Sequence, residues 1–368
     1  MTEFVLPIRA DLQGLEPYGA PQDSVRARLN VNENPFEPSE SLRKALSEAV
    51  FQATGDLNRY PDRDALRLRN VLSEYIERES EFHCDSERIW AANGSNEIMA
   101  HVFAAFGGPD RCAITFPPTY SMYPEYARNA FTQLVAVERN KDFTINVDNA
   151  CTAIEIHKPA LVLIASPNNP TGTAIRLDEL REIIECARDH GAIVVVDEAY
   201  AEFRHRKDAT AVRLLDSYPN LIVARTLSKA FGFAGARVGY CLSSSRQIID
   251  ALMLVRLPYH LSAITQAAAV AALENSSELV EQVSLLRHER DAMIAALLGL
   301  GLTVSPSDAN FVFFGEFEDR HVIWQGLYDR GVLIRETGPE TWLRVSVGTP
   351  SENKLFLEAM ADLVSSDR

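Results

Sequence analysis

Residues 221–240, LIVARTLSKAFGFAGARVGY, decide both the fold and the chemistry that we expect of this chain. The segment opens with an apolar run that is typical of a buried strand. Lys229 follows that run, among Gly, Ala and Phe residues. Most lysines are solvated, but an amine that loses its hydration has a lowered pKa and forms an imine more readily. The segment therefore predicts a reactive amine at Lys229.

Two neighbours of this lysine suit a bound anion. Ser228 supplies a hydroxyl, and Arg237, eight residues after Lys229, supplies a fixed cation. Both groups are suited to binding phosphate. The glycines allow close backbone approach but do not form G-x-G-x-x-G, so the dinucleotide fingerprint is absent.

Two earlier motifs also follow apolar runs. Asn169 lies in SPNNPTG after the run ALVLIA, and in an open parallel sheet ligands bind beyond the carboxyl ends of strands. An ordinary Pro/Gly turn explains that motif equally well. Asp197 ends the run AIVVVD and Tyr200 comes three residues later. The acid could cap a turn and the tyrosine could belong to the core, but such a pair at the edge of a buried sheet is costly without a partner.

The alternation of apolar runs with helical patterns predicts an α/β fold with a mainly parallel sheet and crossover helices. After about residue 252 the pattern changes to two long helices followed by shorter strands, which predicts a smaller α+β domain. We expect an N-terminal arm at 1–35, a large domain at 36–252 and a small domain at 253–368. The expected strands are 112–116, 133–137, 160–165, 192–197, 221–226, 236–242, 310–314, 332–336 and 342–348; the expected helices begin at Ser39 and Ser95 or span 64–79, 177–190, 265–274, 278–300 and 352–363.

Composition narrows the class of protein. With 368 residues, 46% hydrophobic and 24% charged, the chain has room for two packed domains. A net charge of −15 argues against a nucleic-acid partner. We expect no membrane span and no secretion signal, hence a cytoplasmic protein. The five scattered cysteines predict reduced thiols, and the absence of H-E-x-x-H and G-x-S-x-G argues against metal or serine hydrolases.

The ordered motifs NPTG, D-x-A-Y and S-K with Arg eight residues on closely resemble the aminotransferases of pyridoxal-phosphate fold type I. A longer set resembles the histidinol-phosphate aminotransferase family almost from end to end: YGAPQ, LNVNENPFEPS, LNRYPDRDA, AANGSNEI, PPTYSMY, LVRLPYHLS, PSDANFVFF and WLRVSVGT. The resemblance implies pyridoxal 5′-phosphate as cofactor. It also implies exchange of an amino group between histidinol phosphate and 2-oxoglutarate, giving imidazole acetol phosphate and glutamate in histidine biosynthesis.

The same resemblance assigns roles around the cofactor ring. Lys229 would form the Schiff base and then move a proton between substrate and cofactor. Asp197 would pair with the pyridine nitrogen and keep it protonated. Tyr200 and Asn169 would hydrogen-bond the cofactor 3′-oxygen. Tyr120 would stack on the ring, unless it is a core tyrosine.

For the cofactor phosphate, the resemblance implies donors at a helix N-terminus, where free N–H groups suit an anion. Some relatives carry an acid at the position where this chain has Ser95-Asn96, so side-chain contacts there are less secure than backbone ones. Tyr60 would come from the other subunit, which makes a homodimer part of the expectation. The implied phosphate contacts are Tyr60, Ser95, Asn96, Thr226, Ser228 and Arg237.

Substrate binding is expected from Arg335 and Arg344 on strand-like segments, because arginine grips carboxylate or phosphate with paired hydrogen bonds. One slot could serve glutamate and the phosphate monoester, although either residue could be an ordinary surface arginine. Tyr18 would close over the phosphate. The alternatives are an aromatic amino-acid aminotransferase, a decarboxylase of a phosphorylated amino acid, and a non-catalytic cofactor-binding regulator, which usually carries a DNA-binding module.

Overall fold

A seven-stranded sheet forms the centre of the larger part of the molecule. The computed structural model describes residues 4, 6–17 and 19–366. The sheet is mainly parallel, as predicted, and only β8 runs antiparallel to both of its neighbours. In spatial order its strands are β2 (Ile89–Ala92), β8 (Gly239–Leu242), β7 (Leu221–Thr226), β6 (Ile193–Asp197), β5 (Leu161–Ala165), β3 (Cys112–Thr115) and β4 (Gln133–Ala136).

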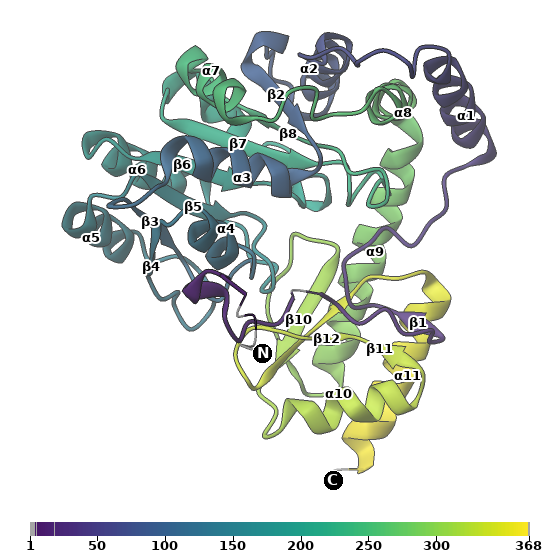
Figure 1. Ribbon diagram of the computed structural model, residues 1–368. Coiled ribbons are helices and arrows are strands. Elements are labelled where there is room, and N and C mark those ends of the chain that lie inside the picture. Colours follow the sequence, from purple (N-terminus) through teal and green to yellow (C-terminus); the bar gives the residue numbers. More distant parts are fainter. Residues whose placement is uncertain (1–3, 5, 18, 367–368) are drawn as a thin grey trace.

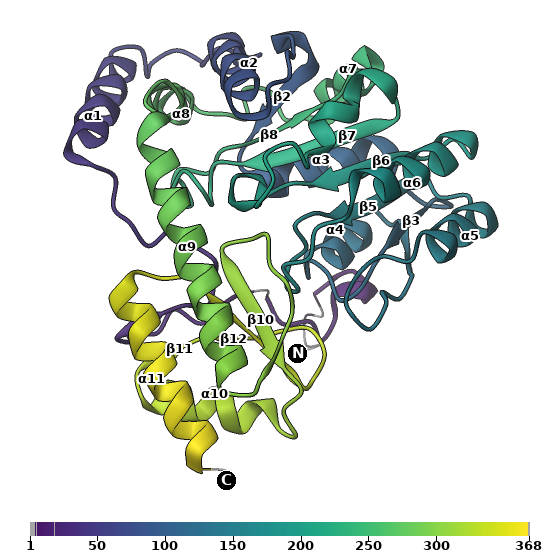
Figure 2. The same cartoon turned by 180° about the vertical axis from the view of Figure 1, so that it is seen from behind.

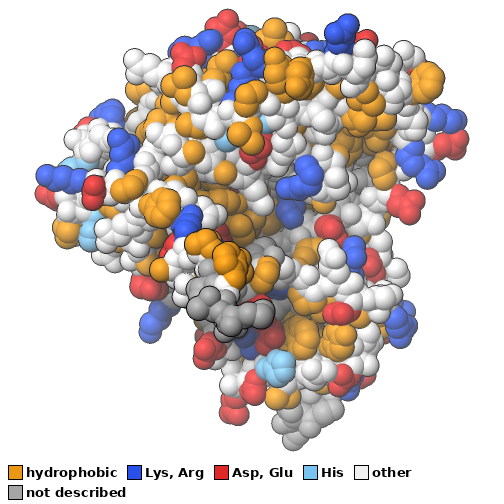
Figure 3. All heavy atoms as spheres, viewed as in Figure 1, with side chains coloured by type: hydrophobic (Ala, Val, Ile, Leu, Met, Phe, Trp, Pro, Cys, Tyr) orange, Lys and Arg blue, Asp and Glu red, His pale blue; other side chains and the backbone are white. Residues whose placement is uncertain are grey.

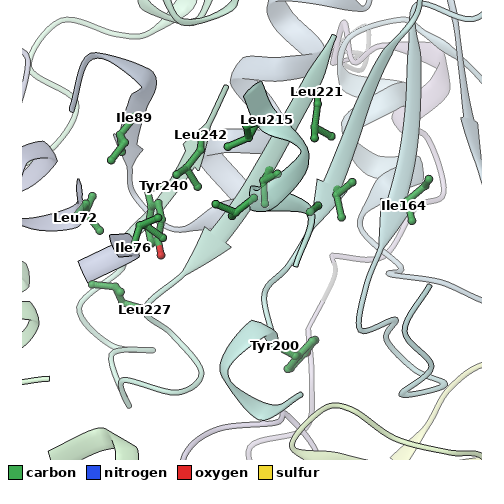
Figure 4. Close-up of a cluster of buried hydrophobic side chains, with 14 of the residues drawn as sticks. Leu72, Ile76, Ile89, Ile164, Tyr200, Leu215, Leu221, Leu227, Tyr240 and Leu242 are labelled. Atoms are coloured by element: carbon green, nitrogen blue, oxygen red, sulfur yellow. The ribbon is translucent and has the colours of Figure 1, made fainter. Parts of the chain in front are cut away.

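Helices cover both faces of this sheet, which explains why its inner strands are continuous apolar runs. Alternate residues of each strand point to opposite faces and join two separate hydrophobic cores. Figure 4 shows part of the larger core, with Tyr200 beyond the end of the sheet. One face packs against α3 (Ser95–Phe106), α4 (Tyr123–Asn129) and α7 (Arg246–Val255); the other packs against α2 (Leu66–Ser80), α5 (Val147–His157), α6 (Leu177–Asp189) and α8 (Ala263–Glu274).

The smaller part of the molecule lies below this sheet in Figures 1 and 2. It is built on a four-stranded antiparallel sheet in the order β12 (Arg335–Glu336), β13 (Trp342–Ser346), β10 (Phe311–Gly315) and β9 (Thr303–Val304). The long helix α9 (Ser277–Gly299) leads into it from the larger part. Its other helices are α10 (Arg320–Asp329) and α11 (Pro350–Ser366).

The N-terminal segment crosses from the smaller part to the larger one. Its strand β1 (Ala27–Arg28) pairs in parallel with β11 (Val332–Leu333), and the chain then leads to α1 (Glu40–Thr54), which packs against α8. Ser39 caps α1 by accepting a hydrogen bond from the backbone N–H of Leu42 at 3.1 Å, so the predicted helix start is confirmed. Short 3-10 helices span Ala10–Leu12, Ser86–Arg88, Ala201–Phe203 and Ala211–Ser217.

The predicted strands are all present, but the predicted segment 332–336 is split into β11 and β12, and β1, β2 and β9 were not expected. Residue 252, which we expected to end the large domain, lies inside α7. The division of the chain into domains stays a prediction.

A cluster of buried ion pairs explains why the otherwise apolar strand β7 contains Arg225. Arg225 is 0% exposed and binds Glu198 from its Nε and Nη2 at 3.1 and 2.9 Å. Its Nη1 binds Glu79 of α2 at 2.7 Å. A buried charge is tolerated only when it is paired in this way, so the cluster ties β7 and α2 to the segment after β6.

The face drawn in Figure 3 carries acidic and basic side chains interspersed among hydrophobic and polar ones. The surface is hollowed between the larger and smaller parts. Among the helices of the described residues, none combines the length and the apolar character needed to cross a lipid bilayer.

Candidate active site

A cavity of about 450 Å³ lies at the carboxyl ends of β5, β6 and β7, where the larger part of the molecule meets the smaller part and the N-terminal segment. In a parallel sheet this edge is where ligands bind. Twelve of the predicted site residues line the cavity: Ser95, Asn96, Tyr120, Asn169, Asp197, Tyr200, Thr226, Ser228, Lys229, Arg237, Arg335 and Arg344.

Lys229 follows the end of β7 and extends into the cavity. Its Nζ donates a hydrogen bond to the carbonyl of Val31 at 3.0 Å. Desolvation by burial, together with the nearby cations Arg344 and Arg237, lowers the pKa of this amine to about 8. A larger neutral fraction near pH 8 makes it a better nucleophile than an exposed lysine.

Asp197 ends β6 and is 6% exposed. Burial raises the pKa of its carboxyl group to about 6, although the Tyr123 hydroxyl opposes this by donating to Oδ2 at 3.2 Å. The backbone N–H of Ala199 donates to the other oxygen at 3.2 Å. No ion pair to Asp197 is found among the described residues, so a protonated ring nitrogen would provide a cation for this carboxylate.

One end of the cavity is suited to phosphate. Helix α3 begins there, and its N-cap Gly94 has φ +82°. A side chain at Gly94 would place its Cβ 2.6 Å from Nη2 of Arg237, so the guanidinium lies directly against the start of the helix. Nη1 of Arg237 donates to the Ser228 hydroxyl at 3.2 Å. The helix N–H groups, this guanidinium and this hydroxyl together form a site for an anion.

The backbone at this end is held in place by a close approach of two segments. A Cβ on Gly239 of β8 would lie 2.3 Å from both the carbonyl carbon of Gly94 and the nitrogen of Ser95. Behind it, Thr226 donates to the carbonyl of Val238 at 3.3 Å. Only glycine at position 239 allows the start of α3 to lie against the end of β7 and the start of β8.

Two tyrosines, Tyr120 and Tyr200, line the cavity. The Tyr120 hydroxyl donates to Oδ1 of Asn96 at 3.2 Å, and its ring meets that of Tyr123 edge-on at 5.7 Å between centroids. Tyr200 is 5% exposed, and its hydroxyl accepts a hydrogen bond from Nδ2 of Asn32 at 3.0 Å. Both rings therefore have fixed positions.

At the other end of the cavity, Arg344 of β13 binds across the interface between the two parts. It donates to Oδ1 of Asn169 and, at 2.7 Å, to the carbonyl of Asn30. Arg335 is more loosely held, with a 3.5 Å hydrogen bond to the carbonyl of Gly19. The two arginines give this end a positive character that suits a carboxylate or phosphate.

Tyr60 is the one described site residue that the structure does not bring into the cavity. Its side chain is 79% exposed and stacks on Tyr259, with ring centroids 4.3 Å apart. Tyr18 lies outside the described residues. His260 stacks on Trp90, and its Nε2 lies 2.9 Å from the carbonyl of Ala91.

The contacts of the site that were not expected from the sequence include the Tyr123 hydroxyl on Asp197, the Val31 carbonyl on Lys229 and the Asn32 amide on Tyr200. The motif PPTYSMY contains Tyr123 three residues after Tyr120, which was a usable signal for a second site tyrosine. The backbone contacts of Asn30 and Val31 left no such signal, because any residue type carries a carbonyl.

These groups fit pyridoxal phosphate. The anion site at the start of α3 and the amine of Lys229, whose pKa is lowered, line the same cavity. The buried carboxyl of Asp197 has no ion-pair partner among the described residues, and a pyridinium would provide one. In the described part of the chain, no cluster of His, Cys, Asp and Glu side chains is arranged to hold a metal ion.

Comparison with known proteins gives the class of protein. Residues 27–360 match the family of class I and II aminotransferases, to which the chain therefore belongs. Within it, the chain belongs with the histidinol-phosphate aminotransferases. It is 52% identical to histidinol-phosphate aminotransferase 3 of Burkholderia lata, over 98% of this chain and 96% of that one. It is 51% identical to the histidinol-phosphate aminotransferase of Thermobifida fusca, over 96% and 95% of the two chains.

A solved structure agrees with this assignment. The histidinol-phosphate aminotransferase of Sinorhizobium meliloti, determined in complex with pyridoxal 5′-phosphate, superposes with a TM-score of 0.86 at 25% identity and covers 100% of both chains. The predicted fold class, a pyridoxal-phosphate-dependent transferase of fold type I, is confirmed.

Proposed function

We propose that this protein is a pyridoxal-phosphate-dependent aminotransferase that interconverts histidinol phosphate and 2-oxoglutarate with imidazole acetol phosphate and glutamate. The observation that carries the proposal is the cavity in which Lys229, Asp197 and the phosphate site at α3 converge. The relatives that share about half of its residues bear the name of this activity.

When bound, pyridoxal phosphate supplies a carbonyl group that condenses with amines and a ring that accepts electrons. Lys229 would bond to that carbonyl, because its lowered pKa leaves much of the amine neutral near pH 8. With substrate bound, the Nζ of Lys229 would take a proton from the substrate carbon and return one.

Asp197 would hold a proton on the ring nitrogen. Its carboxylate lies in a buried position at the end of β6, where a charge interaction is stronger than in water. The hydrogen bond from Tyr123 keeps one oxygen of this carboxylate in place. Tyr200 and Asn169 would contact the 3′-oxygen, and Tyr120 would cover one face of the ring.

Arg344 and Arg335 would bind the acidic group of the substrate. Arg344 is 6% exposed and already oriented by Asn169 and the Asn30 carbonyl, so little side-chain freedom is lost when an anion binds. The same end of the cavity would take the carboxylate of glutamate and the phosphate of histidinol phosphate in turn.

We also propose a homodimer in which Tyr60 enters the phosphate site of the partner subunit. Six exposed apolar side chains support this: Leu57, Tyr60, Leu66, Leu254, Leu257 and Tyr259. We call these six the apolar patch. The segments that carry them are joined, since Arg256 binds Asp64 at 2.9 Å and Tyr60 stacks on Tyr259. Exposed apolar groups gathered in this way are typical of a protein interface.

The reaction itself would take place in the cytoplasm. None of the five cysteines is paired in the structure, which agrees with a reducing compartment.

The test uses the purified protein with its visible cofactor absorption. Histidinol phosphate should change this spectrum, and 2-oxoglutarate should restore it. Turnover of phenylalanine and tyrosine as amino donors, measured in parallel, should be slower. Faster turnover of the aromatic amino acids would replace the proposed substrate by the aromatic alternative, and release of carbon dioxide would indicate a decarboxylase. A protein without visible absorption after addition of pyridoxal phosphate would refute the proposal as a whole.

A further inference from the structure

Three consecutive residues of the N-terminal segment each hold one side chain of the candidate site. The carbonyl of Asn30 accepts from Arg344, the carbonyl of Val31 accepts from Lys229, and the side chain of Asn32 donates to Tyr200. The first two contacts use backbone atoms that every residue type has. The third depends on the side chain, so Asn32 is the position whose identity matters.

Asn32 is held from several sides. It is 1% exposed, and its φ of +57° lies in the left-handed region, which Asn tolerates better than most residues. Its backbone N–H donates to the Ser346 hydroxyl of β13 at 2.8 Å, and its carbonyl accepts from Nδ2 of Asn310 at 3.1 Å. The backbone is thus tied to the smaller part of the molecule, while the amide reaches into the larger part.

The orientation of the Asn32 amide follows from the same serine. Because the Ser346 oxygen already accepts the backbone N–H of Asn32, its own hydrogen needs an acceptor, and Oδ1 of Asn32 lies 2.8 Å away. This places Nδ2 on the other side, 3.0 Å from the Tyr200 hydroxyl oxygen. With the amide reversed, the serine hydrogen would lose this acceptor.

The Tyr200 hydroxyl is therefore the acceptor in its hydrogen bond with Asn32 and does not donate to that side chain. The phenol ring lines the cavity, with Lys229 Nζ 5.9 Å from its centroid. We infer that Asn32 is a positioning residue of the transamination site: it orients the Tyr200 hydroxyl so that its hydrogen points to the cofactor 3′-oxygen. This inference rests on the proposed function, because it requires the cofactor.

The expected effect is electrostatic. A hydrogen bond donated to the 3′-oxygen stabilises negative charge there, so it lowers the pKa at which the Lys229 nitrogen, once joined to the cofactor, loses its proton. Weakening that bond should raise the pH midpoint of the visible absorption. The charged groups around the site, Lys229, Asp197, Arg237, Arg344 and Glu33, stay the same in every variant proposed below.

The experiment is a double-mutant cycle. Asn32→Gly removes the amide but accepts the positive φ. It should raise the midpoint by about half to one pH unit, the size of one hydrogen bond. Tyr200→Phe should raise it in the same direction, and adding Asn32→Gly to Tyr200→Phe should give no further shift. Ser346→Ala, which keeps Asn32 but removes its orienting hydroxyl, should give a smaller shift of the same sign and serves if Asn32→Gly does not fold.

Asn310→Ser is the matched control, because it removes the hydrogen bond to the Asn32 carbonyl but leaves both Ser346 contacts and the amide contact with Tyr200. Its midpoint should equal that of the wild type. Two outcomes would overturn the inference. Asn32→Gly could shift the pH midpoint equally in the wild-type and the Tyr200→Phe background, or neither Asn32→Gly nor Ser346→Ala could shift it. A wild-type protein without visible absorption would instead refute the proposed function, so the two failures are distinguishable.

Discussion

The two titratable groups at the centre of the site, Lys229 and Asp197, both have pKa values moved towards neutral pH. Burial is the main cause in each case, and it acts in opposite directions because it disfavours the ammonium and the carboxylate alike. Both groups are thereby less charged before the cofactor binds than in water. The cofactor would reduce the cost of burying both groups, because its carbonyl would bond to the amine and its ring nitrogen would pair with the carboxylate.

The first prediction concerns the rate at which the cofactor-free protein binds pyridoxal phosphate covalently. Only the neutral amine reacts, so this rate should rise with pH and level off above about 8, where Lys229 is mostly neutral. Arg344→Gln removes a cation that lowers this pKa, and should move the midpoint upwards. The measurement is the growth of visible absorption in a rapid-mixing experiment.

Arg335→Gln is the matched control for this shift. It removes the same charge from the same end of the cavity, but Arg335 is not among the main causes of the lowered pKa of Lys229, so its midpoint should move less. A wild-type midpoint near 10.5, the ordinary value for lysine, would mean that the amine is not desolvated.

A second prediction is that Asp197→Asn stabilises the cofactor-free protein at pH 7.5. The folded carboxyl group keeps its proton up to about pH 6, whereas the unfolded chain loses it near 3.8. The folded state therefore binds more protons in this window, and the free energy of unfolding falls as pH rises through it. The gain from Asp197→Asn should reach up to about 3 kcal/mol above pH 6 and vanish below pH 4.

Urea unfolding of both cofactor-free proteins at pH 4 and pH 7.5 measures this difference. The same substitution should slow transamination strongly, because the ring nitrogen would lose its charged partner. A variant that is less stable than the wild type at pH 7.5 would contradict the prediction, since it would show that the carboxylate is favourable even without the cofactor.

At the scale of elements, the sequence predicted most of the large sheet because both of its faces are buried. The runs before Asn169, Asp197 and Lys229 are apolar at every position or nearly so, and each was correctly placed as a strand. β2 was missed because its four residues, IWAA, are too short to show a period. The contact of Arg344 with Asn169 was also beyond prediction, because it joins elements from the two parts of the molecule.

The third prediction tests the close approach of β8 to α3. Gly239→Ala would force its Cβ against the backbone at Gly94 and Ser95, so the start of α3 must move. We expect a loss of about 2 kcal/mol in the free energy of unfolding. Affinity for pyridoxal phosphate should fall by at least about tenfold, because the helix N–H groups no longer point at the phosphate.

Gly235→Ala is the control for this substitution. It lies in the same segment, but a Cβ there would meet no atom within 4 Å. Thermal unfolding and equilibrium dialysis with pyridoxal phosphate should leave it close to the wild type. If Gly239→Ala binds the cofactor as well as Gly235→Ala does, the anion site does not depend on the position of α3.

At the scale of the whole molecule, a single chain carries every described site residue in one cavity except Tyr60. The sequence could not place Tyr60, because periodicity and motifs describe one chain and a residue that serves another subunit looks like any exposed side chain. Its exposure among the other members of the apolar patch is the physical reason for the proposed dimer.

The fourth prediction uses subunit mixing. Tyr60→Phe should weaken cofactor binding by roughly tenfold, the size of a hydrogen bond to a charged group, and Lys229→Ala should abolish covalent attachment. In a mixed dimer, the chain with intact Lys229 receives Tyr60 from the Lys229→Ala chain. One of its two sites is then complete, so a 1:1 mixture should regain about a quarter of the wild-type high-affinity sites.

Size-exclusion chromatography with differently tagged subunits verifies that exchange has occurred. High-affinity sites that fail to return after verified exchange would show that Tyr60 acts within its own chain or not at all.

The contacts of residues 30–32 determine the order in which the scaffold and the active site form during synthesis. Its carbonyl at Asn30 binds Arg344, and its Asn32 binds Ser346, each 314 residues further along the chain. Synthesis runs from the N-terminus, so residues 30–32 leave the ribosome long before residues 344–346, and these bonds form only after the later residues have been made. The large sheet can assemble earlier, but Lys229 and Tyr200 gain their final neighbours only after residues 344–346 have been made. A growing chain therefore carries a folded scaffold long before it carries an active site.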